Sequence, residues 1–245
     1  MYDVIGDVHG CLPELLELLV KLGYRVKSNL DLVAPPGRRL VFVGDLVDRG
    51  PDIPGTLRLV MRGDAEGTLL TVLGNHDDKL RRTFDGENPK STSGGRAVSL
   101  AQLEKEPKKF RREVRDYLAH LPSRLDLDTG RLIVVHAGLP PREVPDPRHY
   151  YIYGEKTGRK DEFGYEERED WASRYTGSAT VAYGHTPNLD PELKGTTINL
   201  DTGCVFGGRL TALRYPEMTF VSVPAKAKYA DSRRFTAARK RAGLE

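Results

Sequence analysis

The sequence predicts an α/β fold in which two β-sheets pack as a sandwich and helices lie outside them. Three observations indicate this class. Short runs rich in Val, Ile, Leu and Phe recur along the chain and are followed by glycine and polar residues. Near-continuous apolar runs of this length are typical of strands that are covered on both faces. Segments with a helical period lie between several of the runs, and an alternating segment near the end predicts two antiparallel strands.

The predicted strands follow the apolar runs in chain order. They are expected at residues 2–5, 40–43, 69–73, 132–135, 181–183 and 198–200, with the antiparallel pair inside 208–224. Leucines spaced by three, four and seven positions predict a helix over 12–22, with Pro13 in its first turn and Gly23 just past its end.

Further helices are expected at 54–63 and 77–84. Pro107 separates two more within 95–120, a block that interrupts the strand rhythm and is expected to be a helical insertion over one side of the sheet. Residues 154–170 have no apolar period, so we expect an exposed loop there.

Length and charge favour one domain with a basic end. The 245 residues carry 38 Lys and Arg against 35 Asp and Glu, a formal net charge of +3. Residues 225–245 hold seven basic and two acidic side chains, a net of +5, so the other 224 residues sum to −2. We expect a domain over 1–224 and a basic C-terminal tail over 225–245. A solvated terminus is the expected state of that tail, and a grip on nucleic acid is the alternative.

Membrane, secreted and disordered proteins are disfavoured. No apolar run approaches the ~18 residues of a membrane span, and the opening residues are not a basic-then-apolar leader. Cys11 and Cys204 are the only cysteines, too few for a disulfide framework and without zinc-type spacing, and we expect them to pack as small apolar residues. A cytoplasmic protein without a membrane partner fits best.

Short polar loops follow five of the predicted strands. They are GDVHG, GDLVDRG, GNHD, HAG and GHT, in that order. Ligands gather at the carboxyl ends of strands in open α/β sheets, so the loops are expected to converge on one site. They offer two carboxylates, a carboxamide and three imidazoles, from Asp7, Asp45, Asn75, His9, His136 and His185.

Oxygen and nitrogen donors of this kind suit Mn, Fe, Zn, Co or Ni. Six side chains that share one carboxylate are too many for one tetrahedral ion and about right for two. One such loop is usually only a turn, but five in order at strand ends favour a metal site over a structural explanation.

The order of these loops resembles the phosphoprotein-phosphatase branch of the calcineurin-like metallophosphoesterases, and the likeness extends from residue 2 to about residue 215. The resemblance implies a four-layer αββα sandwich with two central mixed β-sheets, two divalent metal ions with manganese preferred, and hydrolysis of phosphate esters or anhydrides by a metal-bridging hydroxide. Two cations about 3.5–4 Å apart can aim such a nucleophile in line at phosphorus.

The resemblance also assigns roles to single residues. Asp7, His9 and Asp45 would hold one ion, and Asp45, Asn75, His136 and His185 the other, with Asp45 as the bridge. Arg49, with Asn75 and His76, would bind the phosphate, and His76, oriented by Asp48, would stand beside the leaving group. The planar fork of an arginine suits phosphate oxygens, and a carboxylate can fix one tautomer of an imidazole.

Departures from the eukaryotic serine/threonine phosphatases narrow the resemblance. Asp77 and Ala137 replace the residues of their GNHE and HGG motifs, and their C-terminal signature is absent. Residues 198–208 resemble instead bacterial symmetrical dinucleoside tetraphosphatases and the phosphatase module of bacterial polynucleotide kinase-phosphatases. No phosphate-binding kinase loop of the form G-x-x-x-x-G-K-[ST] occurs.

Several residues keep two interpretations. Asp201 either reaches the site from behind the ligands or makes only a turn. Arg159, Arg168 and Arg174 are candidates for a second phosphate clamp, with Arg174 placed behind the ligands. Trp171 and Tyr175 either stack on a base or belong to the core. Arg81, Arg82 and the basic helices near 105–115 are expected to line the same cleft.

Three functional classes remain open. The favoured one is a phosphohydrolase of nucleotides, which takes a dinucleoside tetraphosphate or a nucleic-acid phosphate end as substrate. The alternative is a serine/threonine or broad-specificity protein phosphatase. A binding module without catalysis is disfavoured because every expected ligand position is filled. The sequence does not indicate a stable protein partner.

Overall fold

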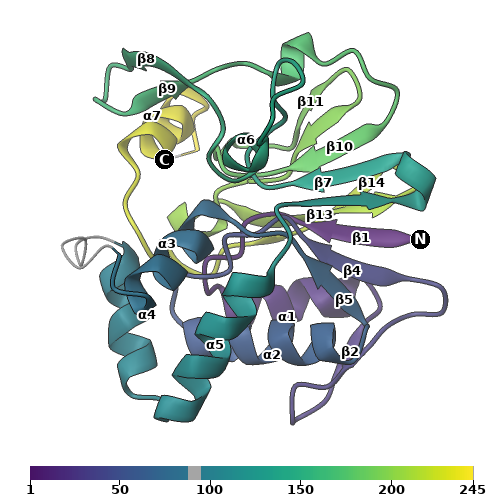
Figure 1. The fold of residues 1–245 in the computed structure, drawn as a ribbon, viewed down its shortest axis with the longest axis vertical. Helices are drawn as coiled ribbons and strands as arrows, with labels where there is room; N and C mark the ends of the chain where they lie inside the picture. Colours follow the sequence, from purple (N-terminus) through teal and green to yellow (C-terminus); the bar gives the residue numbers. More distant parts are fainter. Residues whose placement is uncertain (88–94, 245) are drawn as a thin grey trace.

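The computed structural model describes residues 1–87 and 95–244, which form two five-stranded β-sheets with helices outside them (Figure 1). Each sheet contains both parallel and antiparallel strand pairs. The predicted α/β sandwich of two mixed sheets is confirmed.

The first sheet has the strand order β14-β13-β1-β4-β5. β1, β4 and β5 are parallel, and β13 and β14 extend the sheet as an antiparallel hairpin. All of these strands coincide with predicted ones. Their bounds are Tyr2–Ile5 (β1), Arg39–Phe42 (β4), Leu69–Thr71 (β5), Arg209–Tyr215 (β13) and Thr219–Pro224 (β14).

The second sheet has the strand order β11-β12-β10-β7-β6. Its three central strands are parallel and were predicted, whereas the two antiparallel edge strands were not. Edge strands commonly carry charged side chains, which hide the apolar pattern. The bounds are Arg124–Leu127 (β6), Leu132–Val135 (β7), Thr180–Tyr183 (β10), Glu192–Lys194 (β11) and Thr197–Asn199 (β12).

Apolar side chains cover the central strands on both faces. Between the sheets, valines of β1 and β4 pack against residues of β7, β10 and β12. A larger cluster lies between the first sheet and the helices, and a smaller one covers the outer face of the second sheet. Burial on both faces is the reason that these strands read as unbroken apolar runs in the sequence.

Helices α1 (Leu12–Lys21) and α2 (Ile53–Ala65) cover the outer face of the first sheet (Figure 1). After β5 come α3 (Asn75–Phe84), α4 (Gly95–Glu104) and α5 (Lys108–His120), and the last two are the predicted helical insertion. The short α6 (Arg148–Tyr153) lies at the second sheet, where its Tyr151 oxygen accepts a hydrogen bond from the backbone N–H of Ala137.

Two small features complete the description. Strands β2 (Arg25–Val26) and β3 (Leu32–Val33) pair between α1 and β4. Within the described ranges, every helix is too short or too polar to cross a lipid bilayer.

Residues 154–170 do not form the predicted exposed loop. They contain β8 (Lys156–Lys160) and β9 (Glu166–Arg168), which pair in an antiparallel hairpin. Oδ1 of Asp161 accepts hydrogen bonds from the backbone N–H groups of Phe163 and Tyr165 and so fixes the turn. The strand residues are almost all polar, and no apolar alternation marks them; backbone pairing and turn chemistry define the hairpin instead.

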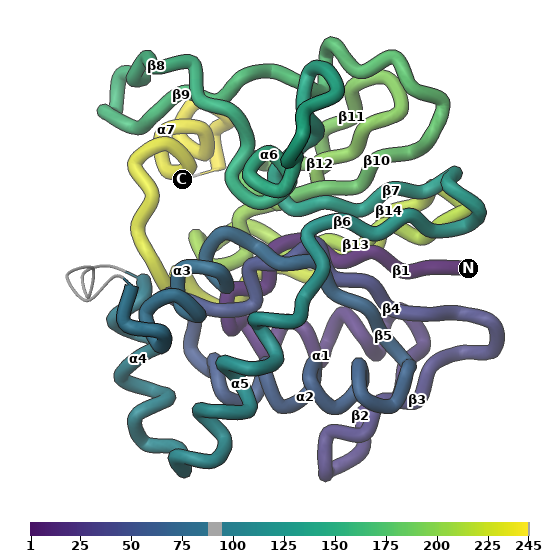
Figure 2. Tube along the Cα trace, viewed as in Figure 1, coloured from purple at the N-terminus to yellow at the C-terminus, as the bar shows by residue number. Residues whose placement is uncertain are grey.

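Residues 225–244 pack against the domain, which corrects the expectation of a solvated tail. Helix α7 (Arg233–Arg241) buries Phe235, which is 1% exposed and lies beside Phe206 with ring centroids 6.0 Å apart. Arg234 forms an ion pair of 2.6 Å with Asp161 in the turn of the β8–β9 hairpin. Figures 1 and 2 show α7 beside that hairpin. The charge count predicted a solvated segment, because Phe235, the one aromatic residue that anchors α7, is outnumbered by basic residues.

Candidate metal centre

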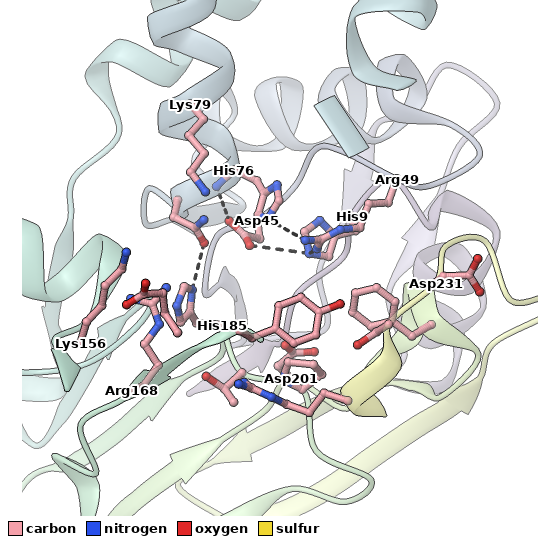
Figure 3. Close-up of a pocket in the computed structure, with 18 residues that line it drawn as sticks. His9, Asp45, Arg49, His76, Lys79, Lys156, Arg168, His185, Asp201 and Asp231 are labelled. Atoms are coloured by element: carbon pink, nitrogen blue, oxygen red, sulfur yellow. Dashed lines mark hydrogen bonds and ion pairs between the residues drawn. The ribbon is translucent and has the colours of Figure 1, made fainter. Parts of the chain in front are cut away.

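The six side chains predicted as metal ligands lie together at the carboxyl ends of strands from both sheets. All except the partly exposed histidine after β10 are buried. Four of the six, His9, Asp45, Asn75 and His185, line the pocket drawn in Figure 3. Asp7 and His9 follow β1, Asp45 follows β4, Asn75 begins α3, His136 follows β7 and His185 follows β10.

Three of these side chains converge on one point. Nε2 of His136 lies 3.0 Å from Oδ1 of Asn75 and 3.1 Å from Nδ1 of His185, and the latter two atoms are 2.9 Å apart. Nδ1 of His136 donates a 3.0 Å hydrogen bond to the backbone oxygen of Val43. Burial lowers the pKa of His136 to about 3, so its ring is neutral and Nε2 carries no hydrogen.

The contact between Nε2 of His136 and Oδ1 of Asn75 therefore joins two acceptors. A hydrogen on Nδ1 of His185 cannot satisfy that contact, because it lies on neither atom. A divalent cation accepts electron pairs from all three atoms, so this part of the cluster fits a metal ion.

Asp45 lies between the two halves of the cluster. Its Oδ1 is 3.4 Å from Nε2 of His136, and its Oδ2 is 3.6 Å from Nε2 of His9. Each carboxylate oxygen thus faces a different histidine, as a bridging ligand requires. An oxygen of Asp7 lies within 4.8 Å of the Asp45 and His136 ligand atoms, and the Asp7 carboxylate accepts the backbone N–H of His185 at 3.2 Å.

Around His9, the cluster presents lone pairs that attract a positive charge. Nδ1 of His9 donates to the backbone oxygen of Val47 at 2.7 Å, so its Nε2 is an acceptor. The Arg49 guanidinium donates to Nε2 of His9 at 2.6 Å and to Nε2 of His76 at 2.9 Å. A cationic group therefore lies where the imidazole lone pairs meet. Backbone carbonyls that orient ligating imidazoles are also typical of metal sites.

Left-handed backbone conformations concentrate in the site. Residues other than glycine adopt them rarely, at a cost of about 1–3 kcal/mol when they are strained. Their persistence indicates that the surrounding loops fix the positions of these side chains. The φ angles are 46° at His9, 51° at Asp45, 74° at Asp48, 73° at Arg49 and 75° at His185.

Carboxyl groups are crowded in this buried volume. Burial, with help from the nearby Asp201 and Asp45 carboxylates, raises the pKa of Asp7 well above its usual range. Burial likewise raises the pKa values of Asp45 and Asp201 to about 7. Burial lowers the pKa values of His9 and His185 well below the usual histidine range. A bound divalent cation would stabilise the ionised form of these carboxyl groups and would bind the lone pairs of the neutral imidazoles.

His76 is oriented by a chain of hydrogen bonds that starts on the inserted helix α4. Its Nδ1 donates to Oδ2 of Asp48 at 2.5 Å. Oδ1 of Asp48 accepts from Oγ of Ser99 at 2.6 Å, and the backbone N–H of Asp48 donates to the same Oγ at 2.8 Å. His76 lies in the first turn of α3 rather than on a strand-end turn, and its Nε2 faces the pocket.

Only one of the three arginines proposed as a second phosphate-binding residue lines the pocket. Arg168 lines the pocket. Arg159 and Arg174 lie outside it and form ion pairs with Glu167 and Glu169, so the placement of Arg174 behind the ligands is wrong. All three arginines lie within four residues of an acidic side chain, and only the fold decides which cation faces the pocket. Asp201 is 5% exposed and lines the pocket.

The aromatic candidates belong to the core. Trp171 packs edge-on against Tyr183 at 4.8 Å and donates Nε1–H to the backbone oxygen of Ala137 at 3.1 Å. Tyr175 lies in the same apolar cluster on the outer face of the second sheet.

Arg81 and Arg82 of α3 and the basic residues of α5 do not line the site, contrary to expectation. Arg81 forms ion pairs with Asp78 and Asp85, and Arg82 with Glu87. The basic residues of α5 border a separate surface pocket beside Phe84. Cys11 and Cys204 are buried free thiols, as expected.

Sequence reasoning missed several residues of the pocket, whose volume is about 400 Å³. Lys79 lies three positions after His76 on α3, a spacing that could have indicated it. Most of the others had no local signal, because they come from the unpredicted hairpin, the turn Cys204–Phe206 and the C-terminal segment. They include Lys156, Tyr165, Glu166, Phe206, Asp231 and Arg234.

Asp77 is a further missed residue, with a supporting position. Its carboxylate accepts hydrogen bonds from the backbone N–H groups of Leu46 at 3.0 Å and Gly74 at 3.1 Å. It therefore ties the loop that carries Asp45 to the start of α3.

Comparison with known proteins places the chain among metallophosphatases. The model of the family described as calcineurin-like phosphoesterase matches residues 2–220. A protein of Geobacillus sp. (strain WCH70) is 44% identical over 238 residues, 93% of this chain and 95% of the relative. One of Bacillus subtilis (strain 168) is 40% identical over 240 residues, 95% and 98% of the two chains. Both relatives are named bis(5'-nucleosyl)-tetraphosphatase PrpE, asymmetrical.

Solved structures agree in fold. A structure described as a diadenosine tetraphosphatase superposes with a TM-score of 0.68 at 30% identity, covering 91% of this chain and 93% of that one. A serine/threonine phosphatase from Saccharomyces cerevisiae has a TM-score of 0.62 at 15% identity, covering 92% and 79%, and shows the shared fold alone. The resemblance noted at residues 198–208 was to symmetrical tetraphosphatases, whereas the curated relatives carry the asymmetrical name.

Proposed function

Because the chain belongs to the calcineurin-like phosphoesterase family, it is a hydrolase of phosphoric ester or anhydride bonds, and we propose that its substrate is a dinucleoside tetraphosphate. The names of the relatives support this choice. The observation that carries it is the pocket beside the ligand cluster, which combines cations with an exposed aromatic ring. Tyr165 is 43% exposed there, and a nucleobase can stack on such a ring.

The proposed metal ligands are those expected from the sequence. Asp7, His9 and Asp45 would hold one ion, and Asp45 would share the second with Asn75, His136 and His185. We propose manganese as the metal, because carboxylate, amide and imidazole donors suit it. Two such ions would supply Lewis-acid activation of water and neutralise the charge on phosphorus oxygens.

The residues around the ligands would do the remaining work. Arg49 presents a guanidinium fork that can grip phosphate oxygens, with Asn75 and His76 beside it. In its doubly protonated form His76 can donate a proton from Nε2 to the leaving oxygen, while Asp48 accepts the hydrogen bond from Nδ1. Burial and the Arg49 cation lower the pKa of His76 well below the usual histidine range, and the negative charge of a bound phosphate would raise it again. Ser99 fixes Asp48 in turn. Asp201 would not bind a metal itself but would act on the ligand Asp7 through its charge, since its buried carboxylate lines the same pocket.

Asymmetrical cleavage of a dinucleoside tetraphosphate gives a nucleoside monophosphate and a nucleoside triphosphate. We propose this outcome for the present chain on the names of its relatives. We also propose that the protein works in the cytoplasm, because its two cysteines are too few for the disulfide framework of a small secreted protein.

A substrate panel with Mn²⁺ tests the proposal. It compares diadenosine tetraphosphate, a 2′,3′-cyclic nucleotide, 3′-phosphorylated RNA, a phosphopeptide and p-nitrophenyl phosphate by kcat/KM, and it identifies the products by chromatography. We expect the dinucleoside tetraphosphate to be hydrolysed fastest, to a monophosphate and a triphosphate. A phosphopeptide that exceeds it by tenfold would support the alternative, a protein phosphatase, and overturn the substrate assignment.

A further inference from the structure

Besides Arg49 and Arg234, three cationic side chains line the pocket without belonging to the proposed metal ligands. Lys79 lies on α3, Lys156 on β8 and Arg168 on β9. Figure 3 shows Lys156 and Arg168 on the His185 side of the cluster, whereas Arg49 lies on the His9 side.

None of the three forms an ion pair with a carboxylate in residues 1–87 and 95–244. Arg168 donates only to the backbone oxygen of Tyr153, at 2.7 Å, and the Lys79 ammonium lies 5.9 Å from the Tyr153 ring centroid. Other cations of the same region are neutralised: Arg159 pairs with Glu167, and Arg234 with Asp161.

The hairpin places two of the unpaired cations directly opposite one another. In the β8–β9 register, Lys156 pairs with Arg168. Like charges at directly opposed positions destabilise a strand pair. This repulsion is relieved when an anion lies between the two side chains.

Lys79 has an unfavourable position of its own. It is half-buried, and burial lowers its pKa from the usual lysine value. It also lies one helical turn from Asn75, so two divalent ions in the proposed centre would repel it. A polyanion in the pocket would offset both costs.

The hairpin that carries Lys156 and Arg168 is tied to the C-terminal helix by ion pairs. Arg234 and Arg241 of α7 form ion pairs of 2.6 Å with Asp161 and Glu162 in the hairpin turn. These ion pairs link the hairpin backbone, on which Lys156 and Arg168 are paired, to the C-terminal helix.

We propose that Lys79, Lys156 and Arg168 form a subsite for the phosphates of the polyphosphate chain that are not being cleaved. The subsite rests on the proposed function and adds to it a selection of chain length. With these phosphates held on the His185 side, the bond that reaches the metal centre is set by how far the chain extends from the subsite. A triphosphate segment is then bound more tightly than a single phosphate.

Direct binding of inorganic tripolyphosphate tests the subsite without turnover. The full chain is freed of metal with a chelator and titrated calorimetrically with tripolyphosphate and, separately, with inorganic phosphate. We expect tripolyphosphate to bind at least about tenfold more tightly, with an affinity that falls as salt rises. Equal affinity for the two anions would overturn the proposal.

Matched variants assign the binding to the named side chains. Lys156→Ala should weaken tripolyphosphate binding by about tenfold, and Lys156→Arg, which keeps the charge, should retain most of it. The control is Lys160→Ala, on the same strand but outside the pocket. An equal loss in Lys160→Ala, or none in Lys156→Ala and Lys79→Ala, would contradict the subsite. Circular dichroism of each variant checks that the hairpin fold is kept.

Product analysis separates this proposal from the proposed function. If the Mn²⁺-loaded protein hydrolyses no dinucleoside polyphosphate, the proposed function fails, yet tripolyphosphate binding that depends on Lys156 would still support the subsite. If diadenosine tetraphosphate is hydrolysed but Lys156→Ala and Lys79→Ala leave its KM and its products unchanged, the function stands and the subsite is wrong.

Discussion

Ser99 donates a 2.6 Å hydrogen bond to Oδ1 of Asp48, the carboxylate whose other oxygen accepts from His76. Ser99 lies on α4, in the helical insertion, and it is fully buried. A helix that contributes no side chain of its own to the pocket thus fixes the group that orients the proposed proton donor.

Ser99→Ala should therefore reduce kcat by about tenfold, since a hydrogen bond to a charged group contributes about 1.5–3 kcal/mol. The loss should be larger on an alkyl phosphate, whose alkoxide leaving group needs a proton, than on p-nitrophenyl phosphate, whose leaving group needs little protonation. The alkaline limb of the pH–rate profile, which reports loss of the proton from His76, should also shift. Ser173→Ala, which removes an exposed hydroxyl paired with Asp170, is the control and should change neither measurement.

His76→Ala tests the proton donor directly. We expect a loss of about 10²- to 10⁴-fold on substrates with a poor leaving group and a far smaller loss on p-nitrophenyl phosphate. Metal content by elemental analysis should stay unchanged. Equal losses on both substrates together with depleted metal would make His76 a ligand instead.

Asp45→Asn tests the bridge. Its two oxygens face His136 and His9, so the variant should weaken binding of both ions. Activity should fall by more than about 100-fold, because even residues behind a ligand change metal affinity by about 10- to 100-fold. Two metals per chain with normal turnover would refute the bridging role. Asp116→Asn, on an exposed part of α5, should bind metal normally.

The metal-free protein should lose stability as pH rises from about 6.5 to about 8. Burial raises the pKa values of Asp45 and Asp201 to about 7, so their protonated forms favour the fold, and this contribution is lost as pH rises through that value.

Histidines with lowered pKa values act in the opposite direction, but only below about pH 6.5, where the unfolded chain takes up protons. Each 1 kcal/mol lost lowers Tm by about 2–4 °C in a chain of this size. Thermal melts with chelator and with Mn²⁺ should therefore diverge as pH rises, because bound cations stabilise the ionised carboxylates. If the two curves of Tm against pH stay parallel, the pKa values of Asp45 and Asp201 are not raised in the metal-free protein.

Phe235→Ala should release the C-terminal helix. Truncating a buried phenylalanine costs about 3–5 kcal/mol, and Phe235 is the buried residue of α7. Limited trypsin digestion should then cleave the variant within 226–241 well before the rest of the chain. Leu244→Ala, 55% exposed, is the control and should be cut at the parent rate.

The strands and the ligand residues could be predicted from the sequence because both leave a local signal. A strand buried on both faces needs an unbroken apolar run, and β1, β4, β7 and β10 have one. The loops that follow need a polar ligand beside a glycine. Gly184 shows the reason: a Cβ there would lie 2.0 Å from Oδ1 of Asp7.

The hairpin β8–β9 and the place of α7 could not be predicted in this way. Almost all of the strand residues of the hairpin are polar, and α7 is anchored by Phe235 among basic residues. Backbone pairing and ion pairs such as Arg234–Asp161 join segments about 70 residues apart, and no local pattern encodes that distance.

The sequence by itself determined the two sheets, the converging loops and the six donor side chains, because apolar runs and loop chemistry are properties of neighbouring residues. Only the tertiary structure decided which cations face the pocket. Arg168 points into it while Arg174 turns to Glu169, and Lys156 is set opposite Arg168 by strand register. Direction and pairing depend on contacts between distant segments, and these exist only once the chain has folded.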